Sequence, residues 1–190
     1  MKKMNKKGFT LIELLAVIVI LGLLMAIAIP SVTKYITQSR KKTLVNSIDS
    51  FITATTTAVN NNEFGALSNE DKIYYIPVSN DATKSCISLE KGGTDPFGNW
   101  VDAYVAVNYN ASTYSYDYYF TFNDDAGYGM ALTKSDAIKP SGDGQIVNPV
   151  PDAAKTGSIT SQKVPLPAGS TSTKGQTPVV LTVGTCTATI

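Results

Sequence analysis

The fold of this 190-residue chain is decided by the stretch Lys6-Lys7-Gly8-Phe9-Thr10-Leu11-Ile12-Glu13-Leu14-Leu15 and the apolar run that follows it. Every residue from Leu14 to Ile29 is apolar or glycine. Counted from Phe9, the segment is long enough to cross a bilayer, whose hydrocarbon core takes about 20 helical residues. Glu13 is out of place there, because an acid at the bilayer centre costs about 2.5–3.5 kcal/mol and usually has a partner. We therefore expect a membrane-inserted helix whose carboxylate pairs with a positive group.

The composition narrows the possible functions. The chain has 16 basic and 15 acidic residues, and four of the basic ones fall in the first eight positions: Lys2, Lys3, Lys6 and Lys7. The remainder is mildly acidic, which argues against a nucleic-acid partner. The chain has no histidine, which removes the commonest general base and the commonest transition-metal ligand. We therefore expect no catalytic centre, no metal and no cofactor.

Charge and hydropathy leave three interpretations of the N-terminal segment. It can be a secretory signal peptide, cut after Ala28 in the small-residue triplet Ala26-Ile27-Ala28, which would release a soluble protein. It can be a simple membrane anchor with its lysines in the cytoplasm. In the third interpretation a peptidase cuts on the cytoplasmic side, between Gly8 and Phe9, and the apolar helix is retained.

The motif Gly8-Phe9-Thr10-Leu11-Ile12-Glu13 favours the third interpretation. Together with its basic leader it resembles the processing motif of type IV pilins and type II pseudopilins, and in particular a Gram-positive, type IVa-like pilin. The resemblance implies a prepilin leader at residues 1–8, cleavage between Gly8 and Phe9, and N-methylation of Phe9. It also implies a role in assembly for Glu13, which in this family neutralises the new amine of an adjacent subunit. Physically, a buried carboxylate needs a positive partner, and the cut before Phe9 creates one.

Two helix-disfavouring residues lie in the apolar run. Gly22 costs about 1 kcal/mol in a helix interior and Pro30 about 3 kcal/mol, although membrane helices tolerate both. In assembled pili of the family the stretch between such residues can lose its helicity. The resemblance therefore implies that Gly22 to Pro30 is a helix-melting segment.

The helical pattern continues beyond the membrane segment. Apolar or small residues recur at three- and four-residue steps, at Val32, Tyr35, Ile36, Val45, Ile48, Phe51, Ile52, Thr55 and Val59. We expect one helix over residues 9–59, about 75 Å long, with residues 9–30 as the transmembrane segment and filament core. The basic cluster Arg40-Lys41-Lys42 is then either a solvated face or a partner for acids of neighbouring subunits.

Residues 60–190 are expected to form a globular head. Short β-prone pieces lie at 73–78 and 85–89, and Thr94-Asp95-Pro96-Phe97-Gly98-Asn99-Trp100 has turn chemistry that resembles the start of the sheet in major pseudopilins and many Gram-positive pilins. Residues 101–108 and 114–123 alternate as a hairpin, and a third strand follows at 128–133. The aromatic face of the second hairpin strand is expected to pack on the helix. The predicted fold class is α+β, a long N-terminal helix packed on an antiparallel sheet, as in the pilin fold.

The C-terminal region is less regular. Residues 137–177 are rich in Pro, Gly, Ser and Thr and are expected to form a loop-rich region, and a last strand is expected near 180–183. Cys86 and Cys186 form an even pair in an exported chain, which suggests a disulfide, with a pair of free thiols as the alternative. A calcium site at Asp124-Asp125 and Asp143 lacks a full set of spaced ligands.

The resemblance implies a structural subunit of a type IV pilus that serves adhesion, motility or biofilm formation, and not an enzyme. Its partners would be further copies of itself, a prepilin peptidase and methyltransferase, the pilus assembly machinery, and membrane lipid before assembly; nucleic acid is not expected. It would lie in the cytoplasmic membrane with its N-terminus inside, and later on the cell surface. The alternatives are a pseudopilin of a type II secretion-like system, a DNA-uptake (competence) pilin, and a secreted adhesin cut after Ala28.

Overall fold

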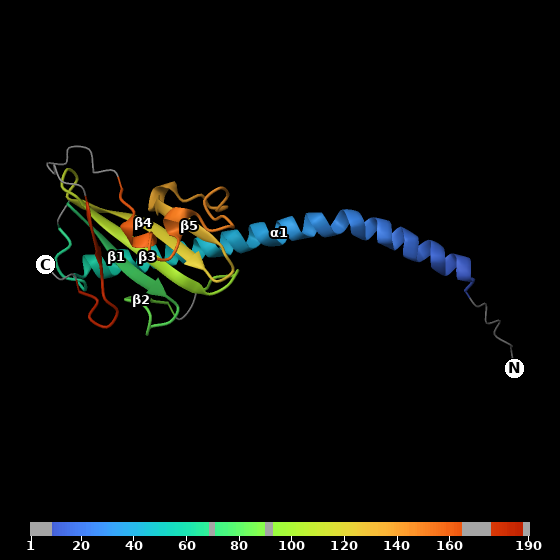
Figure 1. The fold of residues 1–190 in the computed structure, drawn as a ribbon, viewed down its shortest axis with the longest axis horizontal. Coiled ribbons are helices and arrows are strands. Elements are labelled where there is room, and N and C mark those ends of the chain that lie inside the picture. Colours follow the sequence, from blue (N-terminus) through green and yellow to red (C-terminus); the bar gives the residue numbers. More distant parts are fainter. Residues whose placement is uncertain (1–8, 69–70, 90–92, 165–175, 188–190) are drawn as a thin grey trace. The chain divides into compact units, whose positions relative to one another are not determined.

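A computed structural model describes residues 9–68, 71–89, 93–164 and 176–187. The elements run in the order α1 (Leu11–Asn60), β1 (Lys72–Ser79), β2 (Ile87–Ser88), β3 (Trp100–Asn110), β4 (Ser115–Asp124), β5 (Gly129–Lys134), η1 (Ser135–Ala137), η2 (Asp152–Ala154), η3 (Ile159–Ser161) and β6 (Thr177–Val180) (Figure 1). The chain divides into two compact units, one ending at Ser39 and one starting at Arg40. We call the second unit the head and describe each unit by itself.

The first unit is the N-terminal part of α1. It is long and apolar enough to cross a membrane, with a mean hydropathy of 3.0 over its most apolar window. Helical structure continues through Pro30, which cannot donate to the carbonyl four residues back. Just beyond it, the Ser31 and Thr33 hydroxyls donate to the carbonyls of Ile27 and Ile29, at 3.5 and 3.0 Å. Proline removes one backbone donor from this part of the helix, and the two hydroxyls are additional donors to carbonyls close to it.

In the described residues the head contains a six-stranded sheet, in which five strands follow the order β2-β1-β3-β4-β5 and the sixth, β6, also pairs with β1. Strands β1, β3, β4 and β5 pair antiparallel, as expected for the fold class. Two short strands, β2 and β6, pair parallel with the remaining edge of β1. The last strand spans Thr177–Val180 and shares only Val180 with the expected strand at 180–183. Residues 182–186 instead form a turn, in which the Cys186 amide donates to the Thr182 carbonyl at 2.9 Å.

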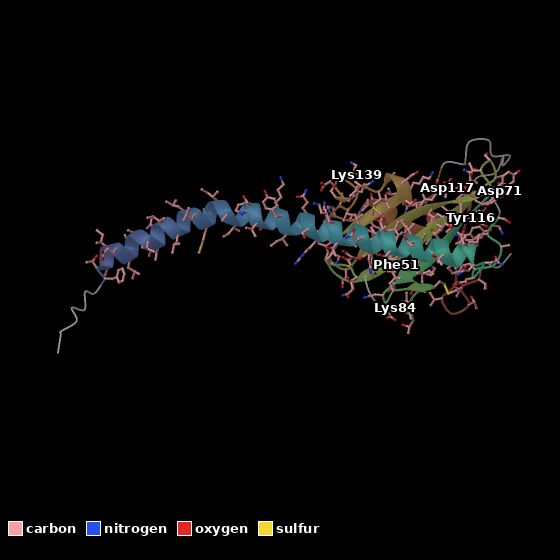
Figure 2. The ribbon with its side chains drawn as sticks, turned by 180° about the vertical axis from the view of Figure 1, so that it is seen from behind. Phe51, Asp71, Lys84, Tyr116, Asp117 and Lys139 are labelled. Carbon is pink, nitrogen blue, oxygen red and sulfur yellow. A yellow bond between two sulfur atoms is a disulfide. The ribbon has the colours of Figure 1, made fainter. Side chains whose placement is uncertain are left out.

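The C-terminal part of α1 packs on one face of this sheet. Leu44, Ile48 and Phe51 are fully buried and share one core with Phe120 and Phe122 of β4. Figure 2 shows Phe51 on α1 against the sheet. Its ring stacks on that of Phe120, with 6.4 Å between centroids. The three- and four-residue steps of the helix thus meet the period-2 face of the hairpin, which confirms the predicted α+β packing.

The opposite face of the sheet is also covered. A second buried cluster contains Ile73, Tyr75 and Ala106 from the strands and Val164 from the segment after η3. That segment is attached by side chains: Tyr75 donates to the Gln162 carbonyl at 2.6 Å, and Gln162 Oε1 accepts from the Leu132 amide at 2.7 Å. The described part of the expected loop-rich region is therefore an ordered cover for the sheet. Residues 165–175 of that region lie outside the described residues.

Candidate functional site

The predicted processing and assembly site lies at the start of α1. Gly8 falls outside the described residues, and Phe9 is 92% exposed. Glu13 Oε2 accepts the Thr10 backbone amide at 2.8 Å and the Thr10 hydroxyl at 2.7 Å, and the Glu13 amide donates to Thr10 Oγ1 at 3.3 Å. This is a capping box, in which the residue before the helix and the third helical residue satisfy each other's amides.

The capping box gives the Glu13 carboxylate hydrogen-bond partners within its own chain. Its carboxylate already has two donors within one chain, so it does not depend on a positive partner for all of its hydrogen bonds. The Thr-x-x-Glu pattern that marks this arrangement is present in the sequence at Thr10 and Glu13. A cut before Phe9 would leave the Phe9–Thr10 peptide bond intact, so the Thr10 amide would still be present to donate to Glu13.

Gly22 and Pro30 are both within α1 and helical in this structure. A Cβ added at Gly22 would meet nothing within 4 Å. Packing within this chain therefore gives no reason for a glycine at position 22. Its suggested role in local melting of the helix stays a prediction that concerns the assembled filament.

The two cysteines form a disulfide. Cys86 and Cys186 have their Cα atoms 5.5 Å apart and are 100 residues apart in sequence. The bond joins the turn after β6 to the residue just before β2, so it ties both parallel strands to the same part of the sheet.

The turn that precedes β3 is held by acidic residues. Asp95 Oδ1 accepts the Phe97 amide at 2.8 Å, and Asp125 accepts the backbone and side-chain amides of Asn99, both at 2.8 Å. A Cβ on Gly98 would collide with Asp125 Oδ1 and would lie 3.1 Å from the Ala126 Cβ, so glycine leaves room for this carboxylate. Among the described residues, no group of three or more Asp, Glu, Cys or His side chains is placed to hold a metal ion.

A buried carboxylate lies beneath this turn. Asp124 is 7% exposed, its Oδ1 accepts the Tyr128 amide at 2.6 Å, and its carboxyl group shares a side-chain hydrogen bond with Asp95. Burial, reinforced by the negative charge of Asp95, raises the pKa of Asp124 to about 6. Burial also raises the pKa of Asp95. The sequence does not predict the contact between Asp95 and Asp124, because the two residues lie in turns that are far apart along the chain.

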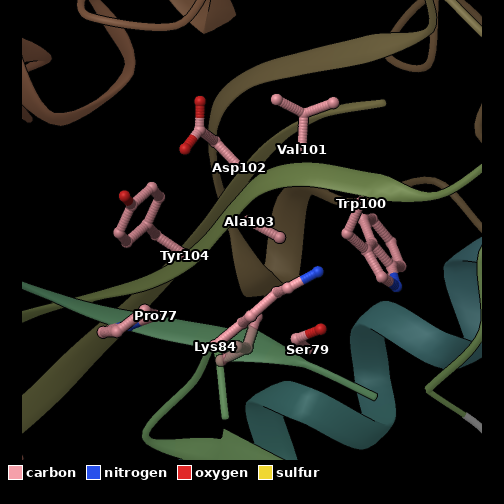
Figure 3. A pocket seen from close by; sticks show the side chains of 9 residues that line it. Pro77, Ser79, Lys84, Trp100, Val101, Asp102, Ala103 and Tyr104 are labelled. Atoms are coloured by element: carbon pink, nitrogen blue, oxygen red, sulfur yellow. The ribbon is translucent and has the colours of Figure 1, made fainter. Parts of the chain in front are cut away.

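A small pocket lies where β1 and β3 diverge (Figure 3). Their pairing ends at Pro77 and Tyr104, and the pocket beyond it has a volume of about 60 Å³. It is too small for an ordinary ligand, since ligand sites measure about 300–1,000 Å³. A wider depression of about 470 Å³ adjoins it, and the charged groups there, Lys84 and Asp81, pair with each other at 3.6 Å. Neither feature was predicted from the sequence.

Comparisons with known proteins find similarity in the N-terminal segment. Residues 3–29 match the prokaryotic N-terminal methylation motif. A ComG operon protein 3 homologue from Bacillus licheniformis is 46% identical over 54 residues, which is 27% of this chain and 56% of that protein. The chain thus spans about half the length of this curated relative. No solved structure matches the chain.

The methylation motif coincides with the stretch that carries the capping box and the apolar part of α1. The head adds the expected architecture, a long helix packed on a largely antiparallel sheet. With the match to the ComG operon protein 3 homologue, these findings support a type IV pilin-like protein.

Proposed function

We propose that the chain is the precursor of a structural subunit of a type IV pilus, cut between Gly8 and Phe9 and methylated on the Phe9 amine. The subunits then polymerise into a surface filament that serves adhesion, motility or biofilm formation. The single observation that carries the proposal is the methylation motif at residues 3–29, set at the start of a 50-residue helix. In this proposal the chain is the substrate of a processing enzyme and is not itself an enzyme.

The exposed apolar surface of α1 supports assembly. Large apolar side chains from Leu11 to Ile36 are 47–83% exposed in the single chain. A patch of this kind needs lipid or protein to cover it. In the precursor the bilayer would cover residues 9–30, with the N-terminus in the cytoplasm, and in the filament the helices of neighbouring subunits would do so.

Glu13 would guide this assembly electrostatically. Its carboxylate lies in the first turn of the helix, next to the position where processing creates an amine on Phe9. In a membrane, an amine of one subunit and a carboxylate of another each lower the cost of burying the other's charge. The capping box would hold the carboxylate in place for that partner.

A DNA-uptake (competence) filament is the second candidate function. It is favoured by the similarity to the ComG operon protein 3 homologue, although that similarity covers only 27% of this chain. Both functions use the same cleavage and the same helix, so they differ only in what the filament does.

Two measurements test these proposals. Mass spectrometry of the chain from its native host should find a mature N-terminus at methylated Phe9, whereas a chain starting at Ile29 would show signal-peptide cleavage and end the proposal. Deletion of the gene should then remove surface filaments. Loss of DNA uptake, with adhesion and motility unchanged, would instead select the competence function.

A further inference from the structure

Three consecutive basic residues lie where α1 enters the head. We call Arg40, Lys41 and Lys42 the basal basic cluster; they begin the second compact unit. Arg40 and Lys42 are exposed, and Lys41 is partly exposed. None of the three takes part in an ion pair with a carboxylate of the described residues. Their charges are therefore available to a partner outside the head.

The neighbouring loop adds to the positive charge at this end. Lys139 is exposed and is labelled on the head in Figure 2. The Gly142 amide donates to the Lys139 carbonyl at 2.8 Å, and a Cβ on Gly142 would meet Val45 Cγ2 at 3.4 Å, so this loop packs on the next turn of α1. The loop thus brings a fourth cation, together with the exposed acid Asp143, to the base of the head.

Positive charge is concentrated here while the rest of the head is acidic. From residue 43 to the C-terminus the sequence has eight basic and fourteen acidic residues, and no acid lies between Glu13 and Asp49. In a precursor anchored with its N-terminus inside, the cluster stands on the outer side, where the positive-inside rule does not place basic residues. Membrane topology therefore does not account for it.

In a precursor anchored through residues 9–30, the cluster would lie within electrostatic reach of a bilayer. Ten residues separate it from Pro30, at the end of the apolar run, which is about 15 Å of helix. Lipid headgroups occupy about 5–7 Å beyond the hydrocarbon core, and the Debye length at physiological salt is about 8 Å. Lys34 lies nearer to Pro30 in the sequence, and Tyr35, which is 72% exposed, would fall at the interfacial depth where tyrosine is enriched.

We propose that the basal basic cluster binds the phosphate groups of anionic lipids on the outer leaflet, and so holds the base of the head against the membrane before assembly. Each basic residue near an anionic surface strengthens binding by about five-fold, and the Arg40 guanidinium can bind a phosphate through two parallel hydrogen bonds. Lipid is favoured over nucleic acid because an anchored chain keeps the cluster beside the headgroups at high effective concentration, while the acidic head would repel a polyanion. The inference rests on the proposed function only in requiring that residues 9–30 anchor the precursor.

The chain carries its own reporter for a test. Trp100 is the sole tryptophan and packs edge-on to Phe51 of α1, with 6.1 Å between ring centroids. The full-length chain is placed in phosphatidylcholine nanodiscs, one copy per disc, with a trace of acyl-labelled dansyl lipid as the energy acceptor. At low salt, fluorescence energy transfer from Trp100 should be about twofold greater to dansyl-phosphatidylglycerol than to dansyl-phosphatidylcholine. The ratio should fall to about 1 in 0.5 M salt, because screening removes the attraction.

A matched pair of variants isolates the cluster. The triple variant Arg40→Gln, Lys41→Gln, Lys42→Gln should give a ratio of about 1 at low salt. The control Lys72→Gln, Lys155→Gln, Lys163→Gln removes the same charge from other parts of the head and should keep the twofold preference.

Three outcomes would overturn the proposal. The first is equal transfer to both lipids by the inserted wild-type chain at low salt, which leaves the proposed function untouched. The second is equal transfer to both lipids combined with salt-sensitive binding of duplex DNA. If the triple variant loses that DNA binding, the cluster is a nucleic-acid site. The third is a chain that does not insert into the discs, which contradicts the anchored precursor as well.

Discussion

Glu13 accepts two hydrogen bonds from a single residue, Thr10, through its backbone amide at 2.8 Å and its hydroxyl at 2.7 Å. The bonds give this carboxylate a structural role at the helix start that is separate from its proposed role between subunits. Substitutions can separate the two roles, because glutamine can replace glutamate in a capping box but carries no charge.

Glu13→Gln should keep the helix start and impair assembly. We expect normal cleavage after Gly8 but at least about a tenfold drop in filaments sheared from the cell surface, measured by immunoblot against total subunit. Thr10→Ala is the matched variant, because it weakens the cap by about 1 kcal/mol and leaves the charge in place. It should assemble nearly as well as wild type. Equal filament yields from Glu13→Gln and wild type would show that the charge is not needed.

Gly98→Ala should destabilise the head. The added Cβ would collide with Asp125 Oδ1 and would displace the carboxylate that accepts both amides of Asn99. We expect the free energy of unfolding to fall by about 1–3 kcal/mol. Unfolding in urea, monitored by the fluorescence of Trp100, measures this change. Gly22→Ala is the control, since its Cβ meets nothing within 4 Å, and it should leave this transition unchanged.

Asp124 should make the stability of the head fall as pH rises. Burial raises the pKa of Asp124 from its ordinary value of 3.8 to about 6, so the folded state binds the proton more tightly than the unfolded chain. Its stabilising contribution is complete below pH 3.8 and is lost as pH rises through about 6. Asp124→Asn should therefore be more stable than wild type at pH 7.5, by at most about 3 kcal/mol, with the difference vanishing near pH 4.

The neighbouring Asp125 provides a control of opposite sign. Hydrogen bonds from the side chain and backbone of Asn99 lower the pKa of Asp125, so its contribution is present at neutral pH and is lost as pH falls. Asp125→Asn should be less stable than wild type at pH 7.5, and the deficit should shrink in acid. Urea titrations from pH 4 to 8 measure both variants. Parallel pH profiles for Asp124→Asn and wild type would contradict the buried-carboxylate account.

Loss of the disulfide should loosen the parallel edge of the sheet. The double variant Cys86→Ser, Cys186→Ser opens a loop of 100 residues, for which chain entropy predicts a loss of up to about 4.7 kcal/mol. Amide hydrogen exchange should accelerate first in β6, which pairs with β1 and with no other described strand, and least in β3. Uniform acceleration across the sheet would instead show that the bond stabilises the head as a whole.

Local patterns were sufficient for much of this protein. The three- and four-residue steps from Val45 to Val59 predict the helix face that is buried, and the alternation along β3 and β4 predicts the hairpin that receives it. These patterns can be read directly because a helix repeats every 3.6 residues and a strand every two. The capping box at Thr10 and Glu13 is equally local, because its two residues are three positions apart.

The sequence by itself determined the processing motif, the membrane-length helix, the helix face that is buried, and the two central strands, because each depends on residues close together along the chain. Only the tertiary structure decided the parallel pairing of β2 and β6 with β1, the cover that Gln162 and Val164 place over the outer face, and the burial of Asp124 beside Asp95. These contacts join segments far apart in the chain, and their partners are selected by which edges, faces and charges remain unsatisfied once the local elements have formed.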